Sequence, residues 1–228
     1  MSKAKKVILL LVEGITDSAA LTSPLKNYFD SNEVKVEETD GDICYIDNET
    51  PTTVVKTVNK CVSNYLKKQK LLKNNLLIVI HIIDTDGAFI SSEHVQKKAT
   101  GKIEYTESSI LTYSPEKIIE RNKQKLLIVN RLSTLEEIGG FKYRMYYFSR
   151  NMEHVLFNKP EELTTFEKFD LADAFAEKFE NDVAGLLEFF QSDDLQMTCS
   201  YSDSWEFIKQ NSNSLHRFTN FGQIFDLN

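Results

Sequence analysis

The chain has 228 residues, of which 41% are hydrophobic and 27% charged, with 8 Gly and 4 Pro. This composition is typical of a globular protein with a sizeable core, and it excludes a disordered or fibrous chain. The net charge of −7 is unevenly spread, because residues 1–150 carry 22 basic and 19 acidic side chains, whereas residues 151–228 carry 5 and 15. The overall acidity argues against strong nonspecific binding of nucleic acid, although a metal ion and a local basic face can bring phosphates to an acidic site.

The cysteines do not form a recognisable pattern. Cys44, Cys61 and Cys199 form no Cys-x-x-Cys pair and have no histidine at zinc-ligand spacing. We therefore expect neither a disulfide framework nor a zinc site, and a cytoplasmic location suits the chain. The apolar run after the basic first six residues is too short for a signal peptide, and no segment is expected to span a membrane.

Two apolar runs predict strands that are buried on both faces. They cover residues 7–12 and 76–83, and the second is interrupted only by His81. Continuous apolar runs of this length are typical of parallel strands covered by helices on both sides. Inside such a strand, we expect His81 to be a packed core histidine rather than a ligand.

The segment between these runs predicts a helix, a strand and a second helix. Thr16 or Asp17 is the expected N-cap of the first helix, a short strand follows at 34–36, and Pro51 starts the second helix. The order strand, helix, strand, helix, strand predicts parallel βαβ units with right-handed crossovers. The strand at 34–36 ends in Asp40-Gly41-Asp42, for which a simple turn is the preferred interpretation.

Beyond the second apolar run the hydrophobic periodicity is weaker, but further elements are still predicted. A helix is expected over 115–126, a strand over 143–148 and a helical stripe over 171–190. The large apolar side chains after residue 200 predict a tail that is folded onto the rest of the protein. Arg150 and the lysines of the 115–126 helix are candidate phosphate contacts, although charged helix faces are usually only solvated. These lysines are Lys117, Lys123 and Lys125.

Acidic residues follow both apolar runs. Glu13 comes after the first run, and Asp84 and Asp86 come after the second, where Gly87 permits a sharp exit from the strand. In open α/β sheets, ligands and metals bind beyond the carboxyl ends of the strands, so these three carboxylates are expected to converge. Three carboxylates at one point favour a hard divalent cation.

Together, in this order, the two acidic motifs resemble the TOPRIM family, the catalytic domain shared by type IA and type II topoisomerases, DnaG-type primases, ribonuclease M5 and the OLD-family nucleases. The matching segments are Leu11–Asp17 and Ile83–Gly87, and the resemblance covers about residues 6–150. Their Val-Glu-Gly-x-x-Asp form is closest to the OLD-like and ribonuclease M5-like branches. The resemblance implies a Rossmann-like α/β TOPRIM fold with a mostly parallel sheet over 1–150, followed by an acidic, mainly helical extension over 151–228 that packs on it.

The resemblance also implies Mg²⁺- or Mn²⁺-dependent cleavage of phosphodiester bonds in nucleic acid. Asp84 and Asp86 would hold the metal, and Glu13 would bind metal or move a proton, which agrees with what phosphoryl transfer needs. Further candidate metal ligands are Asp17 and Glu153. Candidate substrate contacts are Gly14, Gly87 and Arg150.

Several functional alternatives stay open. A haloacid-dehalogenase-like phosphatase would use Asp84 as its nucleophile, because Ile82–Gly87 also resembles the nucleophile motif of that family, but it would leave Glu13 without a role. A noncatalytic module that binds metal or nucleotide is the third interpretation. No Walker A loop is present, so an ATPase partner would be a separate chain, and a homo-oligomer is conceivable. A stand-alone TOPRIM protein of this kind would suit repair or defence against phage, whereas topoisomerase and primase activity are not expected.

Overall fold

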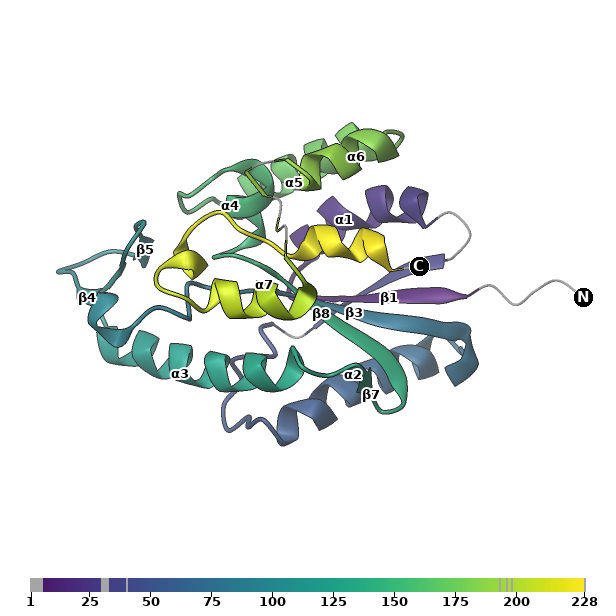
Figure 1. Ribbon diagram of the computed structural model, residues 1–228, viewed down its shortest axis with the longest axis horizontal. Coiled ribbons are helices and arrows are strands. Elements are labelled where there is room, and N and C mark those ends of the chain that lie inside the picture. Colours follow the sequence, from purple (N-terminus) through teal and green to yellow (C-terminus); the bar gives the residue numbers. More distant parts are fainter. Residues whose placement is uncertain are drawn as a thin grey trace, which may run out of the picture.

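The computed structural model describes residues 6–29, 33–39, 41–192, 194–195, 197 and 199–227. Within these residues, a five-stranded sheet of order β2-β1-β3-β8-β7 has helices on both faces (Figure 1). The strands are β1 (Val7–Val12), β2 (Glu33–Glu38), β3 (Leu76–Asp84), β7 (Glu137–Ile138) and β8 (Phe141–Phe148). All neighbours pair in parallel except β7, which is antiparallel to β8. The predicted α/β class with a mostly parallel central sheet is confirmed.

The inner strands are apolar because helices cover both of their faces. All six residues of β1 are buried. Ile8, Leu10 and Val12 belong to the core on one face of the sheet, whereas Leu9 and Leu11 belong to the core on the other. This division follows from the two-residue period of a strand, which sends successive side chains to opposite faces. Each such side chain stabilises the fold by roughly 1.5–3 kcal/mol when it is fully buried.

Seven α-helices of the described residues surround the sheet. Side chains of α1 (Ile15–Tyr28), α4 (Met152–Phe157), α5 (Thr165–Phe179) and α6 (Val183–Phe190) share the core on one face. Those of α2 (Thr53–Lys68), α3 (Pro115–Leu132) and α7 (Tyr201–Ile208) share the core on the other. No helix in the part of the chain that the structure describes is long and apolar enough to cross a bilayer. The proposed division at residue 150 stays a prediction, and helices from beyond it contribute to both cores.

Several predicted elements differ in their bounds. Helix α1 begins at Ile15, with Gly14 as its N-cap, because the carboxylate of Asp17 folds back and accepts the backbone N–H of Gly14 at 3.0 Å. Helix α3 runs six residues beyond the predicted end, to Leu132. The single stripe over 171–190 is two helices, and Asp182 caps the second by accepting the N–H of Gly185.

A small second sheet between Ala88 and Tyr113 was not predicted. Within the described residues it has three strands in the order β4-β6-β5. They are β4 (Val95–Lys97), β5 (Glu104–Tyr105) and β6 (Ile110–Thr112), too short for a periodic pattern to stand out. Short 3₁₀ turns complete the secondary structure: η1 (Lys73–Asn75), η2 (Ser92–His94), η3 (Asn213–Leu215) and η4 (Phe221–Asp226).

The C-terminal tail is folded down, as predicted. Trp205, Leu215 and Phe221 are buried. The backbone of the tail pairs with the end of β8. Phe148 and Thr219 form an antiparallel bridge, and Ser149 donates its N–H to the carbonyl of Phe218 at 2.9 Å. The tail therefore reaches the carboxyl end of β8, the edge at which the acidic strand ends lie.

His81 is a core residue, as predicted. It is 1% exposed, and its Nδ1 lies 2.7 Å from the hydroxyl of Tyr143 on the neighbouring strand. Burial, with a smaller contribution from the Lys125 charge, lowers the pKa of the imidazole to about 4. The folded protein therefore keeps this histidine neutral at a pH at which the unfolded chain has already protonated it.

This depressed pKa predicts a loss of stability in mild acid. The contribution of His81 is complete above the unfolded pKa of about 6.5 and is lost as the pH falls towards the folded value, which amounts to on the order of 2 kcal/mol by about pH 4.5. Urea unfolding at neutral and acidic pH should show a smaller acid-induced loss for the double variant His81→Leu/Tyr143→Phe. Tyr143→Phe alone keeps the histidine and should keep the wild-type loss. Equal losses in all three proteins would contradict this assignment.

Candidate functional site

The parallel pairing of β1 with β3 brings two of the predicted carboxylates together. Leu11 is in register with His81, so both strands end at the same edge of the sheet. There the backbone N–H of Asp84 donates to Glu13 Oε1 at 3.2 Å. Glu13 is therefore fixed against the end of the neighbouring strand and lies beside the second motif.

The Asp-Thr-Asp-Gly turn is locked to the end of β8. Thr85 donates its N–H to the carbonyl of Phe148 at 2.9 Å, and Asp86 donates to the carbonyl of Arg150 at 2.8 Å. In return, the N–H of Arg150 donates to Thr85 Oγ1 at 2.8 Å. Asp86 and Arg150 have φ of 51° and 58°, in the left-handed region that residues other than glycine rarely adopt. Such backbone strain persists where its surroundings enforce it, and it is concentrated at functional sites.

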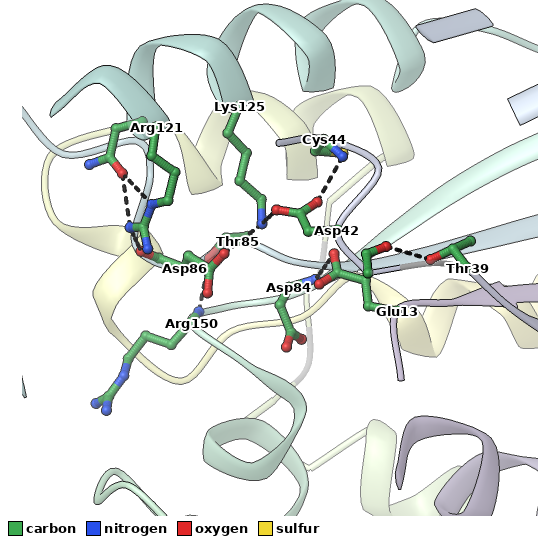
Figure 2. A network of polar contacts seen from close by, with 12 residues as sticks. Glu13, Thr39, Asp42, Cys44, Asp84, Thr85, Asp86, Arg121, Lys125 and Arg150 are labelled. Carbon is green, nitrogen blue, oxygen red and sulfur yellow. Dashed lines mark hydrogen bonds and ion pairs between the residues drawn. The ribbon is translucent and has the colours of Figure 1, made fainter. Parts of the chain in front are cut away.

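A buried lysine from α3 enters this edge. Lys125 has a side chain that is 0% exposed, and its Nζ lies 2.7 Å from Asp86 Oδ2 and 2.8 Å from Asp42 Oδ2 (Figure 2). One helical turn earlier, Arg121 donates from Nη2 to the backbone carbonyl of Asp86 at 2.7 Å. Burial alone would raise the pKa of Asp86, but the charges of Lys125 and Arg121 outweigh it and lower that pKa. We call Asp42, Asp86 and Lys125 the lysine-paired half of the site.

The other carboxylates lack such a partner. In the described part of the chain, Glu13, Asp17 and Asp84 form no ion pair with a lysine, arginine or histidine. Burial raises the pKa of Glu13 well above its ordinary value; the charge of Lys125 lowers it and the surrounding carboxylates raise it further. Burial and the surrounding carboxylates raise the pKa of Asp84 well above its ordinary value. Burial and the charge of Glu153 raise the pKa of Asp17 to about 6, although the hydrogen bond from the N–H of Gly14 lowers it. We call Glu13, Asp17 and Asp84 the open half.

Glu153 borders the open half from the beginning of α4. It is 4% exposed, and Lys168 of α5 pairs with it at 2.7 Å between Nζ and Oε1. Its charge adds to the repulsion on Asp84 and Asp17. In Figure 2 the carboxylate of Asp84 points away from the end of Lys125.

The donors of the open half have the chemistry that a hard cation requires, but they are not arranged as a finished metal site. Carboxylate oxygens are the ligands that Mg²⁺ prefers in proteins. Within the described residues, however, no three carboxylate, imidazole or thiol side chains are placed so that they could hold one ion. The predicted three-ligand set of Glu13, Asp84 and Asp86 stays a prediction.

Each of the three predicted substrate contacts has a structural role or contact within the protein. Gly14 caps α1. Gly87 has a φ of 64°, and a Cβ added there would lie 2.5 Å from Leu215 Cδ2. The Arg150 guanidinium lies 4.9 Å from the ring centre of Tyr105 and donates from Nη2 to the carbonyl of Pro160. Their roles toward substrate stay predictions, and Asp40 lies outside the described residues.

Arg121 was not predicted to belong to the site and Lys125 was expected on a solvated helix face, whereas both are buried. A signal was present in the spacing. Lys125 falls on the buried stripe of α3, seven residues after Ile118 and four before Val129. A lysine on the apolar stripe of a helix needs an acidic partner inside the protein, and Asp42 and Asp86 are that partner.

Comparison of the chain with models of known protein families, with curated proteins and with solved structures gave no match. Because one fold can carry many activities, the function has to be argued from the chemistry of the site.

Replacing Gly87 tests the tight contact between the acidic turn and the C-terminal tail. Gly87→Ala should lose roughly 1 kcal/mol through its positive φ and roughly 1–3 kcal/mol more through the collision with Leu215. Gly41 has a φ of 87° and no atom within 4 Å of an added Cβ, so Gly41→Ala should lose only the first amount. Urea unfolding of both variants measures the difference, and equal losses would argue against the close packing described.

Replacing Lys125 tests the lysine-paired half. Lys125→Met should lower the free energy of unfolding by roughly 3–5 kcal/mol, because it leaves two carboxylates without their cation. Lys123→Met removes an exposed lysine of the same helix and should change stability by less than about 0.5 kcal/mol. Chemical denaturation at neutral pH compares the two. A small effect of Lys125→Met would mean that the ion pairs contribute little.

Proposed function

We propose that this protein is a TOPRIM-like nuclease that cleaves phosphodiester bonds of nucleic acid with the help of Mg²⁺ or Mn²⁺. The observation that carries the proposal is the open half: Glu13, Asp17 and Asp84 lie near one another at the carboxyl edge of a parallel sheet, and none of them forms an ion pair within the described residues. That edge is where open α/β sheets bind their ligands. The order of the two acidic strand ends, with Glu13 before Asp84, supports the TOPRIM assignment.

The raised pKa values of Glu13 and Asp84 support the binding of a cation. Crowded buried carboxylates must either take up protons or find positive charge, and a bound divalent ion would displace such protons and remove the repulsion. Asp84 is the best-placed ligand because no side chain of the described residues forms an ion pair with it. Asp86 is a weaker candidate, because Lys125 already holds its Oδ2. When bound, the ion would polarise the phosphate and stabilise the charge that develops on its oxygens.

The protein groups then have distinct tasks. A raised pKa makes the carboxylate of Glu13 a stronger base than a free one, which suits Glu13 to take a proton from a water or to protonate a leaving oxygen. The hydrogen bond from the N–H of Asp84 keeps Glu13 in position. The locked turn at Thr85 and Asp86 keeps the carboxylates from moving apart when a substrate arrives. Arg150, next to this turn, is a candidate contact for a flanking phosphate if its guanidinium leaves Pro160.

Glu13→Ala and Asp84→Asn should each reduce Mn²⁺-dependent cleavage by at least about 10²-fold, since each removes a group that acts on the reacting phosphate or its metal. Both should stay folded, because both residues lie at the ends of strands and are only partly buried. The measurement is gel-based cleavage of single- and double-stranded DNA and RNA. Glu116→Ala, which removes an exposed carboxylate at the start of α3, is the matched control and should keep full activity.

The same variants separate the proposal from its alternatives. A phosphatase that uses Asp84 as nucleophile would hydrolyse a phosphate monoester, would lose that activity in Asp84→Asn and would tolerate Glu13→Ala. A noncatalytic module would bind Mn²⁺ and cut nothing. Full activity of Glu13→Ala on a substrate that the wild type cleaves would contradict the mechanism proposed here.

A further inference from the structure

A cavity of about 830 Å³ lies at the amino edge of the central sheet, opposite the acidic strand ends. The first residues of β1, β3 and β8 line it, together with the end of α1 and Leu227 of the tail. Its volume falls in the range of roughly 300–1,000 Å³ that is common for small-molecule sites. Ile8 and Ile78, which are register partners on β1 and β3, and Phe29 at the end of α1 give it apolar walls. An apolar molecule of moderate size can therefore bury its surface there.

Arg144 of β8 brings a positive charge to these apolar walls. It is in register with Ile80 of β3, and strand residues two apart point to the same side, so Arg144 lies on the same face as Ile78. It also lines an adjacent cavity of about 280 Å³, between β8 and α7. The arginine thus lies where an apolar cavity meets a smaller one that is lined by α7.

The guanidinium of Arg144 has no negative partner among the described residues. It forms no ion pair there, and its buried Nε has no hydrogen-bond partner. Its Cζ lies 4.2 Å from the ring centre of Tyr201, and it also interacts with the side chain of Tyr146. Burial raises the pKa of the Tyr146 hydroxyl, so this neighbour is uncharged at neutral pH. A buried donor without an acceptor destabilises the protein, and a ligand with acceptor oxygens would remove that cost.

We propose that this cavity binds an organic acid with an apolar body, such as a medium-chain carboxylate. Its carboxylate pairs with Arg144, because two carboxylate oxygens match the N–H groups of a guanidinium, and its body lies against Ile8 and Ile78. Glu136, Glu137 and Lys142 also line the cavity. Their side chains are exposed, so water solvates these charges, whereas Arg144 is partly buried. The site lies at the other edge of the sheet and does not depend on the proposed nuclease function.

Isothermal titration calorimetry of the full chain with decanoate, and in parallel with decanol, tests the class of ligand. Wild-type protein should bind one decanoate per chain. Decanol has the same apolar body without the charge and should bind about 10- to 100-fold more weakly, because a hydrogen bond to a charged group is lost. Absence of decanoate binding, or equal affinity for the two probes, would overturn the inference. Either result would leave the nuclease proposal unaffected, because that proposal is tested by cleavage.

Variants then locate the site. Arg144→Met keeps much of the apolar stem and should weaken decanoate binding about 10- to 100-fold with little change for decanol, whereas Arg131→Met, at an exposed arginine of α3, should change neither. Ile78→Trp fills the cavity and should weaken the binding of both probes. Far-ultraviolet circular dichroism verifies that each variant is folded, and if Arg144→Met is not, the two probes on the wild type and on Ile78→Trp decide. Unchanged decanoate affinity in folded Arg144→Met or Ile78→Trp would contradict the assignment.

Discussion

The ammonium of Lys125 joins three parts of the chain that are far apart in sequence. It rises from α3, it contacts Asp86 in the turn after β3, and it contacts Asp42 in the loop after β2. Two adjacent carboxylates would otherwise repel each other inside the protein, and the lysine would be a buried charge without a partner. Each group is tolerable only because the others are present. The shape of this sheet edge, and hence the position of the open half beside it, depends on that triad.

Much of the fold could be predicted from the sequence because its strands are buried on both faces. Continuous apolar runs identified β1 and β3, and the spacing of Val54, Val58 and Val62 identified α2, whose buried side the structure confirms. Two kinds of feature could not be predicted. The strands of the small second sheet are two or three residues long, so they show no period, and the start of α1 is set by the contact of Asp17 with Gly14 rather than by a capping preference.

The site could be predicted only in part, for an electrostatic reason. The acidic strand ends were visible because topology sends parallel strands to one edge, and Glu13 and Asp84 do meet there. Lys125 determines which carboxylates have their negative charge balanced by an ion pair. It lies in α3, 39 residues after Asp86 in the chain. Its pairing depends on how α3 packs against the sheet. Nothing in a charged helix sequence distinguishes it from the solvated lysines nearby, except its place on the apolar stripe.

The backbone of the Asp-Thr-Asp-Gly turn explains why its two aspartates play different parts. In an extended strand, residues two apart point to the same side, so Asp84 and Asp86 would share one environment. The strand ends at Asp84, and the left-handed φ of 51° at Asp86 turns the chain. The second carboxylate is thereby directed toward α3, and the first is left facing the open half. A short motif therefore supplies one aspartate that pairs with a lysine and one that, within the described residues, forms no ion pair, and the proposed cation would bind at the second.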